Sequence, residues 1–178
     1  MAKDSKIEWT HHTFNPWWGC ERVSPACKNC YAEAWARRLG LDLWSKNSPR
    51  RMLSDAYWRA PLGWDGDAAK VGRRDRVFCA SMADVFENRR DLDAHRARLW
   101  QIIGDTPNLD WLLLTKRPQL IKHGLTGAID AYARTPGCSE AERMLQAWVD
   151  REPPSNVWLG TSVEHQEAAN LRIPMLLN

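Results

Sequence analysis

The sequence predicts a single α/β domain built on a parallel sheet. Short apolar runs alternate with amphipathic stretches along the 178 residues, which is the βαβ rhythm of this fold class. The strand candidates are continuous apolar runs, as strands covered on both faces require. A chain of this length can bury one substantial core. We therefore expect residues 1–178 to form one domain.

The first predicted elements surround a group of cysteines. Residues 14–18 favour a short strand, although Pro16 weakens its pairing. Residues 31–39 predict a helix that ends at Gly40. Its apolar residues lie on one face and are Ala32, Trp35 and Leu39. Residues 41–75 contain several prolines and glycines and predict a long irregular loop, the kind of segment that usually acts as a lid or binding loop.

The remaining elements alternate regularly. Strands are expected at 77–81, 111–115 and 157–160, where the apolar runs are continuous. Helices are expected at 92–104 with Asp91 as its N-cap, at about 118–133 with Pro118 in its first turn, and at 139–151 behind the capping-box pattern Ser139-Glu-Ala-Glu142. A helical tail follows the last strand.

Each predicted strand ends in polar residues. The cysteine loop follows the first strand, and Ser81 and Asp84 follow the second. Lys116 and Arg117 follow the third strand, and Glu164 follows the fourth. Because parallel strands end at one edge of a sheet, where ligands collect, these residues are expected to line one site.

Cys20, Cys27 and Cys30 carry the strongest chemical signal, with the spacing C-x6-C-x2-C and no fourth cysteine nearby. In a reducing compartment such a group binds metal more often than it forms disulfides. Two readings stay open from the residues alone: an iron–sulfur cluster with one open position, or a structural zinc site with His11 or His12 as fourth ligand. Trp17 and Trp18 directly precede the first cysteine and are expected to shield the site from water.

Composition narrows the function classes. The formal net charge is +3, with several arginine doublets that fit either a solvated surface or a nucleic-acid surface. The 11 tryptophans fit core packing by default, and some could stack on a base or sugar. The chain has no apolar run long enough to span a membrane and no secretory signal, so a cytoplasmic location is expected. Phosphate-binding glycine loops and the G-x-S-x-G and H-E-x-x-H motifs do not occur, which argues against P-loop and common hydrolase functions.

Several blocks together resemble a phage- and prophage-associated family of unknown function that carries a three-cysteine motif. The blocks are Gly19-Cys20, Cys27-x2-Cys30-Tyr31-Ala32-Glu33, Ser81-Met-Ala-Asp-Val-Phe86, Leu112-Leu-Leu-Thr-Lys-Arg-Pro118 and Val157-Trp-Leu-Gly-Thr-Ser-Val-Glu164. That family is in turn similar to radical S-adenosylmethionine (SAM) enzymes, whose domains are complete or partial (β/α) barrels. The resemblance therefore implies a partial barrel and, for a phage-encoded protein, the host cytoplasm.

The resemblance also implies roles for individual residues. The three cysteines would bind three irons of a [4Fe–4S] cluster, and SAM would bind the fourth iron and be cleaved to a 5′-deoxyadenosyl radical. Ser81 and Asp84 lie where such enzymes contact the methionine amine of SAM. Lys116, Arg117 and Glu164 lie where contacts to a carboxylate, a ribose or the substrate are expected. The substrate itself is not indicated.

Three departures from the radical-SAM pattern bear on activity. The usual spacing is C-x3-C-x2-C, and the aromatic residue before the third cysteine is replaced here by Asn29. The chain also ends at Asn178, soon after the fourth predicted strand, which predicts a truncated barrel with an exposed edge that another protein chain could complete. The alternatives are a non-catalytic zinc-stabilised module that binds nucleic acid or a host protein, and an inactive fragment.

Overall fold

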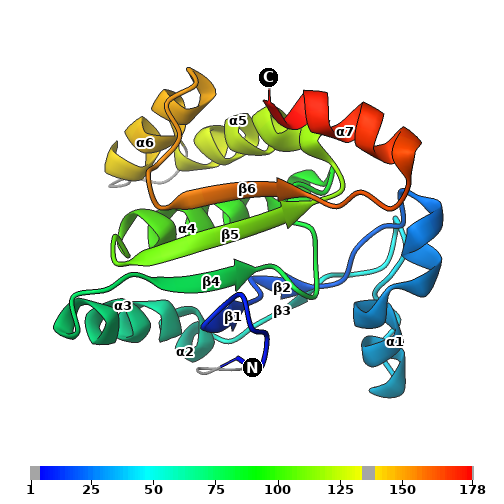
Figure 1. Ribbon diagram of the computed structural model, residues 1–178, viewed down its shortest axis with the longest axis horizontal. Coiled ribbons are helices and arrows are strands. Elements are labelled where there is room, and N and C mark those ends of the chain that lie inside the picture. Colours follow the sequence, from blue (N-terminus) through cyan, green and yellow to red (C-terminus); the bar gives the residue numbers. More distant parts are fainter. Residues whose placement is uncertain (1–4, 134–138, 178) are drawn as a thin grey trace.

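The computed structural model describes residues 5–133 and 139–177 and shows an α/β fold around a parallel sheet (Figure 1). All three strand pairings in this sheet are parallel, and its four strands follow one another in the order β1-β4-β5-β6. This confirms the predicted α/β class and parallel sheet, whereas the partial (β/α) barrel stays a prediction. The strands are β1 (His12–Phe14), β4 (Asp75–Cys79), β5 (Leu109–Thr115) and β6 (Val157–Thr161).

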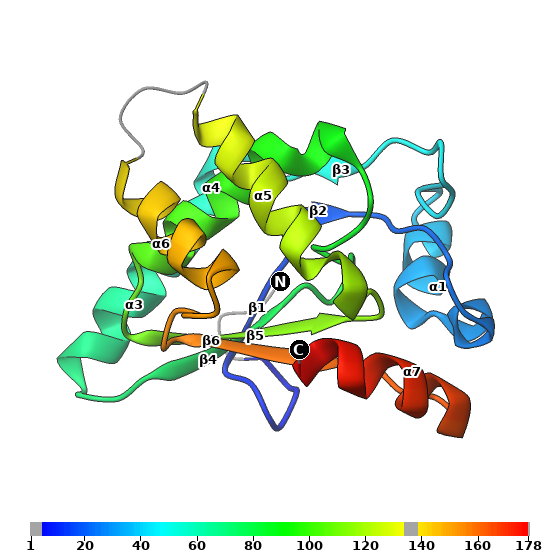
Figure 2. The ribbon, with the colours of Figure 1, turned by 90° about the horizontal axis from the view of Figure 1, so that it is seen from above.

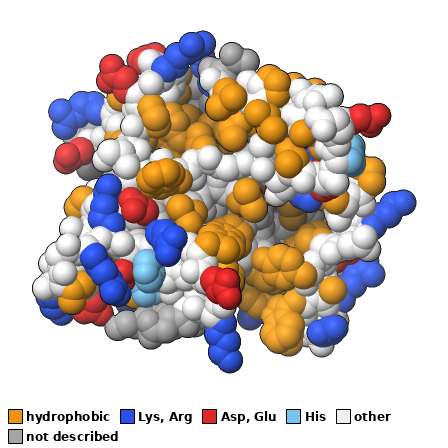
Figure 3. All heavy atoms as spheres, viewed as in Figure 1, with side chains coloured by type: hydrophobic (Ala, Val, Ile, Leu, Met, Phe, Trp, Pro, Cys, Tyr) orange, Lys and Arg blue, Asp and Glu red, His pale blue; other side chains and the backbone are white. Residues whose placement is uncertain are grey.

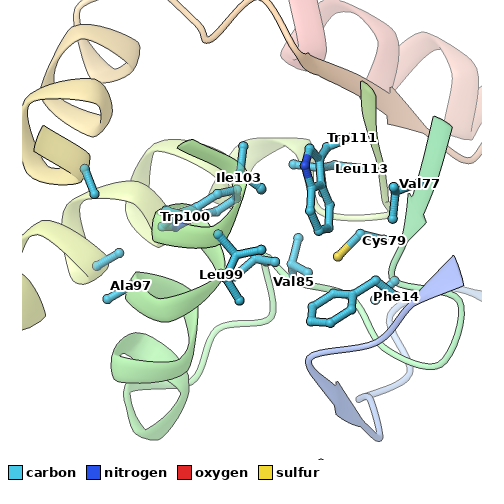
Figure 4. Packing of buried hydrophobic residues seen from close by; sticks show 14 of the residues in the cluster. Phe14, Val77, Cys79, Val85, Ala97, Leu99, Trp100, Ile103, Trp111 and Leu113 are labelled. Carbon is cyan, nitrogen blue, oxygen red and sulfur yellow. The ribbon is translucent and has the colours of Figure 1, made fainter. Parts of the chain in front are cut away.

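The helices that follow β4 and β5 cover one face of the sheet (Figure 2). When strands are added in sequence order, right-handed crossovers place their helices on the same side. The covering helices are α4 (Asp93–Gly104), α5 (Ile121–Tyr132) and α6 (Ser139–Val149), and α7 (Gln166–Leu177) lies beside β6. Between helices and sheet lies the main core, in which α4 contributes Leu99, Trp100 and Ile103 and β5 contributes Trp111 and Leu113 (Figure 4).

The opposite face of the sheet is only partly covered. Phe78, Leu112 and Trp158 are register partners on β4, β5 and β6, so they form a row across this face. Trp158 is 61% exposed, whereas Trp9 packs over Phe78 with ring centroids 4.7 Å apart. Figure 3 shows hydrophobic side chains gathered on this side of the molecule. The sequence prediction of strands covered on both faces is therefore wrong for β6, none of whose residues is buried.

The segment before β4 is more ordered than predicted. The expected strand at 14–18 divides at Pro16, because β2 (Trp17–Trp18) leaves the main sheet and pairs antiparallel with β3 (Arg51–Met52). The predicted loop at 41–75 contains two helices, α2 (Asp55–Trp58) and α3 (Ala60–Lys70). Pro61 is tolerated because it lies in the first turn of α3. Buried tryptophans on both helices stabilise them against the core.

Two helix predictions need correction. Helix α1 (Tyr31–Arg38) ends before Gly40, which has a φ of +73°, as predicted. Its buried residues are Ala32, Glu33 and Ala36, however, and Trp35 and Leu39 are each about half exposed.

The helix predicted at 92–104 begins one residue later, behind the 3-10 turn η2 (Arg90–Leu92). Asp91 pairs with Arg89 and provides no cap to α4. The side chain of Ser139, the predicted cap of α6, lies outside the described residues.

Gly19 gives a direct test of the backbone that leads into the cysteine loop. Its φ is +114°, and a Cβ at this position would lie 2.8 Å from the carbonyl oxygen of Leu43. Gly19→Ala is therefore expected to lower the free energy of unfolding by about 2 kcal/mol or more, as measured by urea denaturation.

Gly63→Ala is the matched control for Gly19→Ala. Gly63 lies in α3 and no atom is within 4 Å of its would-be Cβ. Because alanine favours a helix, this change is expected to stabilise the protein by roughly 0.5–1 kcal/mol. Equal effects of the two substitutions would contradict the strain assigned to Gly19.

Candidate functional site

A cavity of about 270 Å³ lies at the carboxyl ends of β4 and β5, against the cysteine loop. All three cysteines line it, together with four of the predicted rim residues: Ser81, Asp84, Lys116 and Arg117. Glu164 is not among the lining residues, but its carboxylate contacts Lys116. The fold thus brings together side chains from sequence segments almost one hundred residues apart.

The cysteine loop is held by a short turn and a small apolar cluster. Cys27 lies in the 3-10 turn η1 (Pro25–Asn29), and Cys30 is the N-cap residue of α1. Cys20 and Cys30 pack against a buried cluster separate from the main core, formed by Ala32, Ala36, Leu43, Trp44 and Met82. This cluster fixes the loop against the end of β4.

The prediction that Trp17 and Trp18 shield the cysteine site is only partly correct. Trp17 is fully buried in the main core and does not line the cavity. Trp18 packs against the small cluster that also holds Cys20 and Cys30. Trp44 is the tryptophan in the cavity wall. Sequence reasoning missed it because it lies in the irregular segment before β3, where no periodic pattern marks a buried residue.

The thiols of Cys20 and Cys27 lie in different electrostatic surroundings. Burial raises the pKa of Cys20 to about 12, although the neighbouring Arg117 guanidinium opposes this shift. Burial also acts to raise the pKa of Cys27, but hydrogen bonding to the backbone of Val23 and to Ser24, together with the charge of Lys116, outweighs it and lowers the pKa. Cys27 therefore ionises more readily than Cys20 in the metal-free protein.

Asp84 and Arg117 form a buried ion pair beside Cys20. The two Asp84 oxygens accept hydrogen bonds from Thr115 Oγ1 at 2.8 Å, Arg117 Nη1 at 2.9 Å and the backbone N–H of Phe86 and Lys116 at 3.0 and 3.1 Å. Burial acts to lower the pKa of Arg117, but the Asp84 carboxylate and Cys20 outweigh it and raise the pKa. Protein donors thus already occupy the Asp84 carboxylate, and its contact with a ligand amine stays a prediction.

Glu164 connects three separate segments at the rim. Its Oε1 accepts a hydrogen bond from Ser24 Oγ at 2.8 Å and lies 2.9 Å from Lys116 Nζ. Its Oε2 lies 2.7 Å from Arg172 Nη1. Burial would raise the pKa of Glu164, but these three partners lower it to about 2. The carboxylate therefore joins the cysteine loop to the end of β5 and to α7.

Glu164 makes the free energy of unfolding depend on pH in the acid range. Its folded-state pKa of about 2 lies below the ordinary value of 4.5, so its contribution is complete above pH 4.5 and is lost as the pH falls toward 2. Glu164→Gln is expected to flatten the decline in unfolding free energy over this pH range, measured by urea denaturation at successive pH values. Parallel wild-type and variant profiles would contradict this role. Glu140→Gln, at an exposed position on α6, is the control and should retain the wild-type slope.

Asn15 positions Ser81, and sequence reasoning missed it. Its Nδ2 donates to Ser81 Oγ at 3.1 Å, and its Oδ1 accepts from the backbone N–H of Met82 at 2.7 Å. Tyr31 also donates from its hydroxyl to the carbonyl oxygen of Ser81 at 2.7 Å. The sequence signal for Asn15 is its place directly before Pro16, where the first strand must end.

The histidines considered as zinc ligands do not meet the cysteines. His11 Nδ1 accepts a hydrogen bond from the backbone N–H of Arg76, and His12 stacks on Trp64 with centroids 4.5 Å apart. Both lie where β1 begins, and among the described residues no histidine lines the cavity. Within 5–133 and 139–177, no group of three or more His, Cys, Asp or Glu side chains is arranged to hold a metal ion.

The donor chemistry of the cavity suits an iron–sulfur cluster. Its soft ligands are three thiols, the ligand type that such clusters take. Each thiolate of a cluster binds a different iron, so the sulfurs need not surround one ion. A Cys3His zinc site would need a histidine that the cavity lining does not supply.

Helices capable of crossing a membrane are not found in the part of the chain that the structure describes. A comparison with curated proteins and another with solved structures gave no match to this chain. A protein family does match, and the match covers nearly the whole chain. Residues 4–178 match the family described as "Protein of unknown function (DUF5131)", and the chain belongs to that family.

Proposed function

We propose that this protein is a radical-SAM-like iron–sulfur protein in which Cys20, Cys27 and Cys30 bind a [4Fe–4S] cluster. The observation that carries the proposal is the position of all three thiols in the wall of one cavity, at the carboxyl ends of parallel strands. A cluster held by these three cysteines, once reduced by an external electron donor, would supply the electron for reductive cleavage of SAM. These residues do not identify the substrate.

The rim residues give the cavity the contacts that a zwitterionic ligand requires. Lys116 is about one quarter exposed and can present its ammonium group to a carboxylate. Ser81 can offer its hydroxyl from the end of the neighbouring strand β4, where Asn15 holds it. Glu164 acts through Lys116, because it contacts the ammonium group without lining the cavity. Asp84 acts indirectly, because its carboxylate forms the ion pair that orients Arg117.

Apolar side chains form part of the remaining cavity wall, where they help to exclude water. Phe78, Ala80, Leu114, Trp44 and Met82 supply this lining. Phe78 lies in the row across the partly covered sheet face, and Leu114 lies two residues along β5 from Leu112 of that row. The cavity therefore reaches the partly covered side of the sheet, which would face inward in a (β/α) barrel, so a substrate bound there would lie beside the proposed cofactor site.

The winding of the sheet supports the comparison with a partial barrel. Its strands follow in sequence order and its crossover helices lie on one face, as in (β/α) barrels. The resemblance of the cysteine, Ser81–Phe86 and Val157–Glu164 blocks to the phage-associated family supports a phage origin. The predicted pairing with another protein chain would use β6, because β6 is an edge strand of the sheet.

Anaerobic reconstitution with iron and sulfide tests the proposal. The expected product is a brown protein with about four irons per chain and an absorbance band at about 400 nm. Adding SAM and a strong reductant should then release 5′-deoxyadenosine. A colourless protein that holds one zinc ion and leaves SAM intact would support the zinc-stabilised module instead, and the iron–sulfur proposal would be wrong.

A nucleic-acid-binding function is the second candidate, and the exposed tryptophans of the sheet face favour it. Trp158 and Trp9 are 61% and 47% exposed, and Arg76 is exposed on the same face of β4 as Phe78. Bases can stack on such side chains. Trp158→Ala should weaken binding of single-stranded oligonucleotides about tenfold, and Trp158→Phe should weaken it less. Binding that is absent, or that does not weaken with salt, would exclude this function.

A further inference from the structure

We infer that Arg117 is a positioning residue that holds Cys20 at the cavity and raises the reduction potential of the bound cluster. This inference rests on the proposed function, because it concerns the group that the three cysteines would bind. It goes further because it assigns control of the reduction potential of the cluster to Arg117, a side chain that is not itself a metal ligand.

The Arg117 guanidinium connects three groups around Cys20. Nη1 lies 3.6 Å from the Sγ of Cys20 and 2.9 Å from Oδ2 of Asp84, and Nη2 donates to the carbonyl oxygen of Glu21 at 2.7 Å. The arginine thus contacts both the sulfur and the backbone of the next residue. Cys27, in contrast, has the hydroxyl of Ser24 as its sulfur partner, at 3.6 Å.

The position of Arg117 is fixed at both ends of the residue. Its backbone N–H donates to Thr115 Oγ1 at 2.9 Å, and Thr115 Oγ1 in turn donates to Asp84. Asp84 then binds the guanidinium. A shorter or non-planar side chain would lose these contacts, because the planar guanidinium group carries several N–H donors and can contact a carboxylate, a carbonyl oxygen and a sulfur together.

Burial makes this positive charge effective. Arg117 is 3% exposed, so water screens its charge poorly. Reduction adds one negative charge to an iron–sulfur cluster, and a nearby cation stabilises the reduced form more than the oxidised form. Hydrogen bonds to the sulfurs and local charge are established controls of cluster potential. Replacing the guanidinium by a neutral group would leave the Asp84 carboxylate without its cation and so change the local charge by one full unit.

The test compares wild-type protein with Arg117→Gln and Arg172→Gln after anaerobic reconstitution. Arg172 is a suitable control because it is also a buried arginine paired with a carboxylate at the rim, but its contacts are Glu164 and the carbonyl oxygen of Ser162. Redox titration followed by cluster absorbance should show that Arg117→Gln lowers the equilibrium constant for one-electron reduction about tenfold, which corresponds to 59 mV for one electron. Arg172→Gln should stay within about threefold of wild type.

Each outcome decides the inference. A fully loaded Arg117→Gln variant with the wild-type potential would overturn it while leaving the proposed function intact. Wild-type protein that binds no cluster would overturn the proposed function and this inference together. If Arg117→Gln is insoluble, Arg117→Lys replaces it: its single ammonium group should bind Asp84 and lose the sulfur, and so shift the potential in the same direction. A soluble Arg117→Lys variant with unchanged iron content and potential would also overturn the inference.

Discussion

Replacing Cys20, Cys27 or Cys30 by alanine, one at a time, is expected to reduce iron bound after anaerobic reconstitution at least about tenfold. All three cysteines line the same cavity, and each would supply one thiolate bond to the cluster. Iron and sulfide analysis, together with the absorbance of the cluster, measures the loss. A Cys27→Ala variant that loads like wild type would show that the three-thiolate assignment is wrong.

Cys79 provides the matched control for these variants. It is a free cysteine that is fully buried in β4 and belongs to the main core rather than to the cavity (Figure 4). Cys79→Ala should therefore keep full iron loading and cost only about 1 kcal/mol of stability, because it removes one small buried atom. Loss of iron in Cys79→Ala as well would mean that loading reports on folding and not on ligation.

Arg50→Met is expected to lower the free energy of unfolding by about 3–5 kcal/mol, the largest stability effect that the structure indicates. The side chains of Arg50 and Glu87 are fully buried and form an ion pair. Arg50 also donates to the carbonyl oxygens of Leu43 and Ser48, at 3.0 and 2.8 Å. Removing the guanidinium would leave the Glu87 carboxylate buried without its cation. Urea denaturation measures the change.

Two further variants isolate the burial of this ion pair. Lys70 and Asp67 form an exposed pair on α3, and Lys70→Met should cost below about 0.5 kcal/mol. The double variant Arg50→Met/Glu87→Met should recover part of the loss, because no buried charge is then left unpaired. A single Arg50→Met effect as small as that of Lys70→Met would contradict the assigned role.

The sequence predicted those parts of the fold that depend on local pattern. The apolar runs at 77–81, 111–115 and 157–160 correspond to β4, β5 and β6, because continuous apolar residues bounded by polar ones favour strands. The local prediction was wrong for residues 55–70, where Pro61 and two glycines argued against a helix. There the burial of Trp58 and Trp64 outweighs weak helix propensity.

For the candidate site, the sequence alone determined which residues gather at one edge. Parallel strands must end on the same side, so the sequence predicts that Ser81, Asp84, Lys116 and Arg117 lie near the cysteine loop, and all four line the cavity with the cysteines. Only the tertiary structure decided which of these side chains face the cavity and which bind each other. The contact of Glu164 with Ser24 joins residues 140 positions apart, and local periodicity carries no information about such a pair because packing across the whole domain determines it.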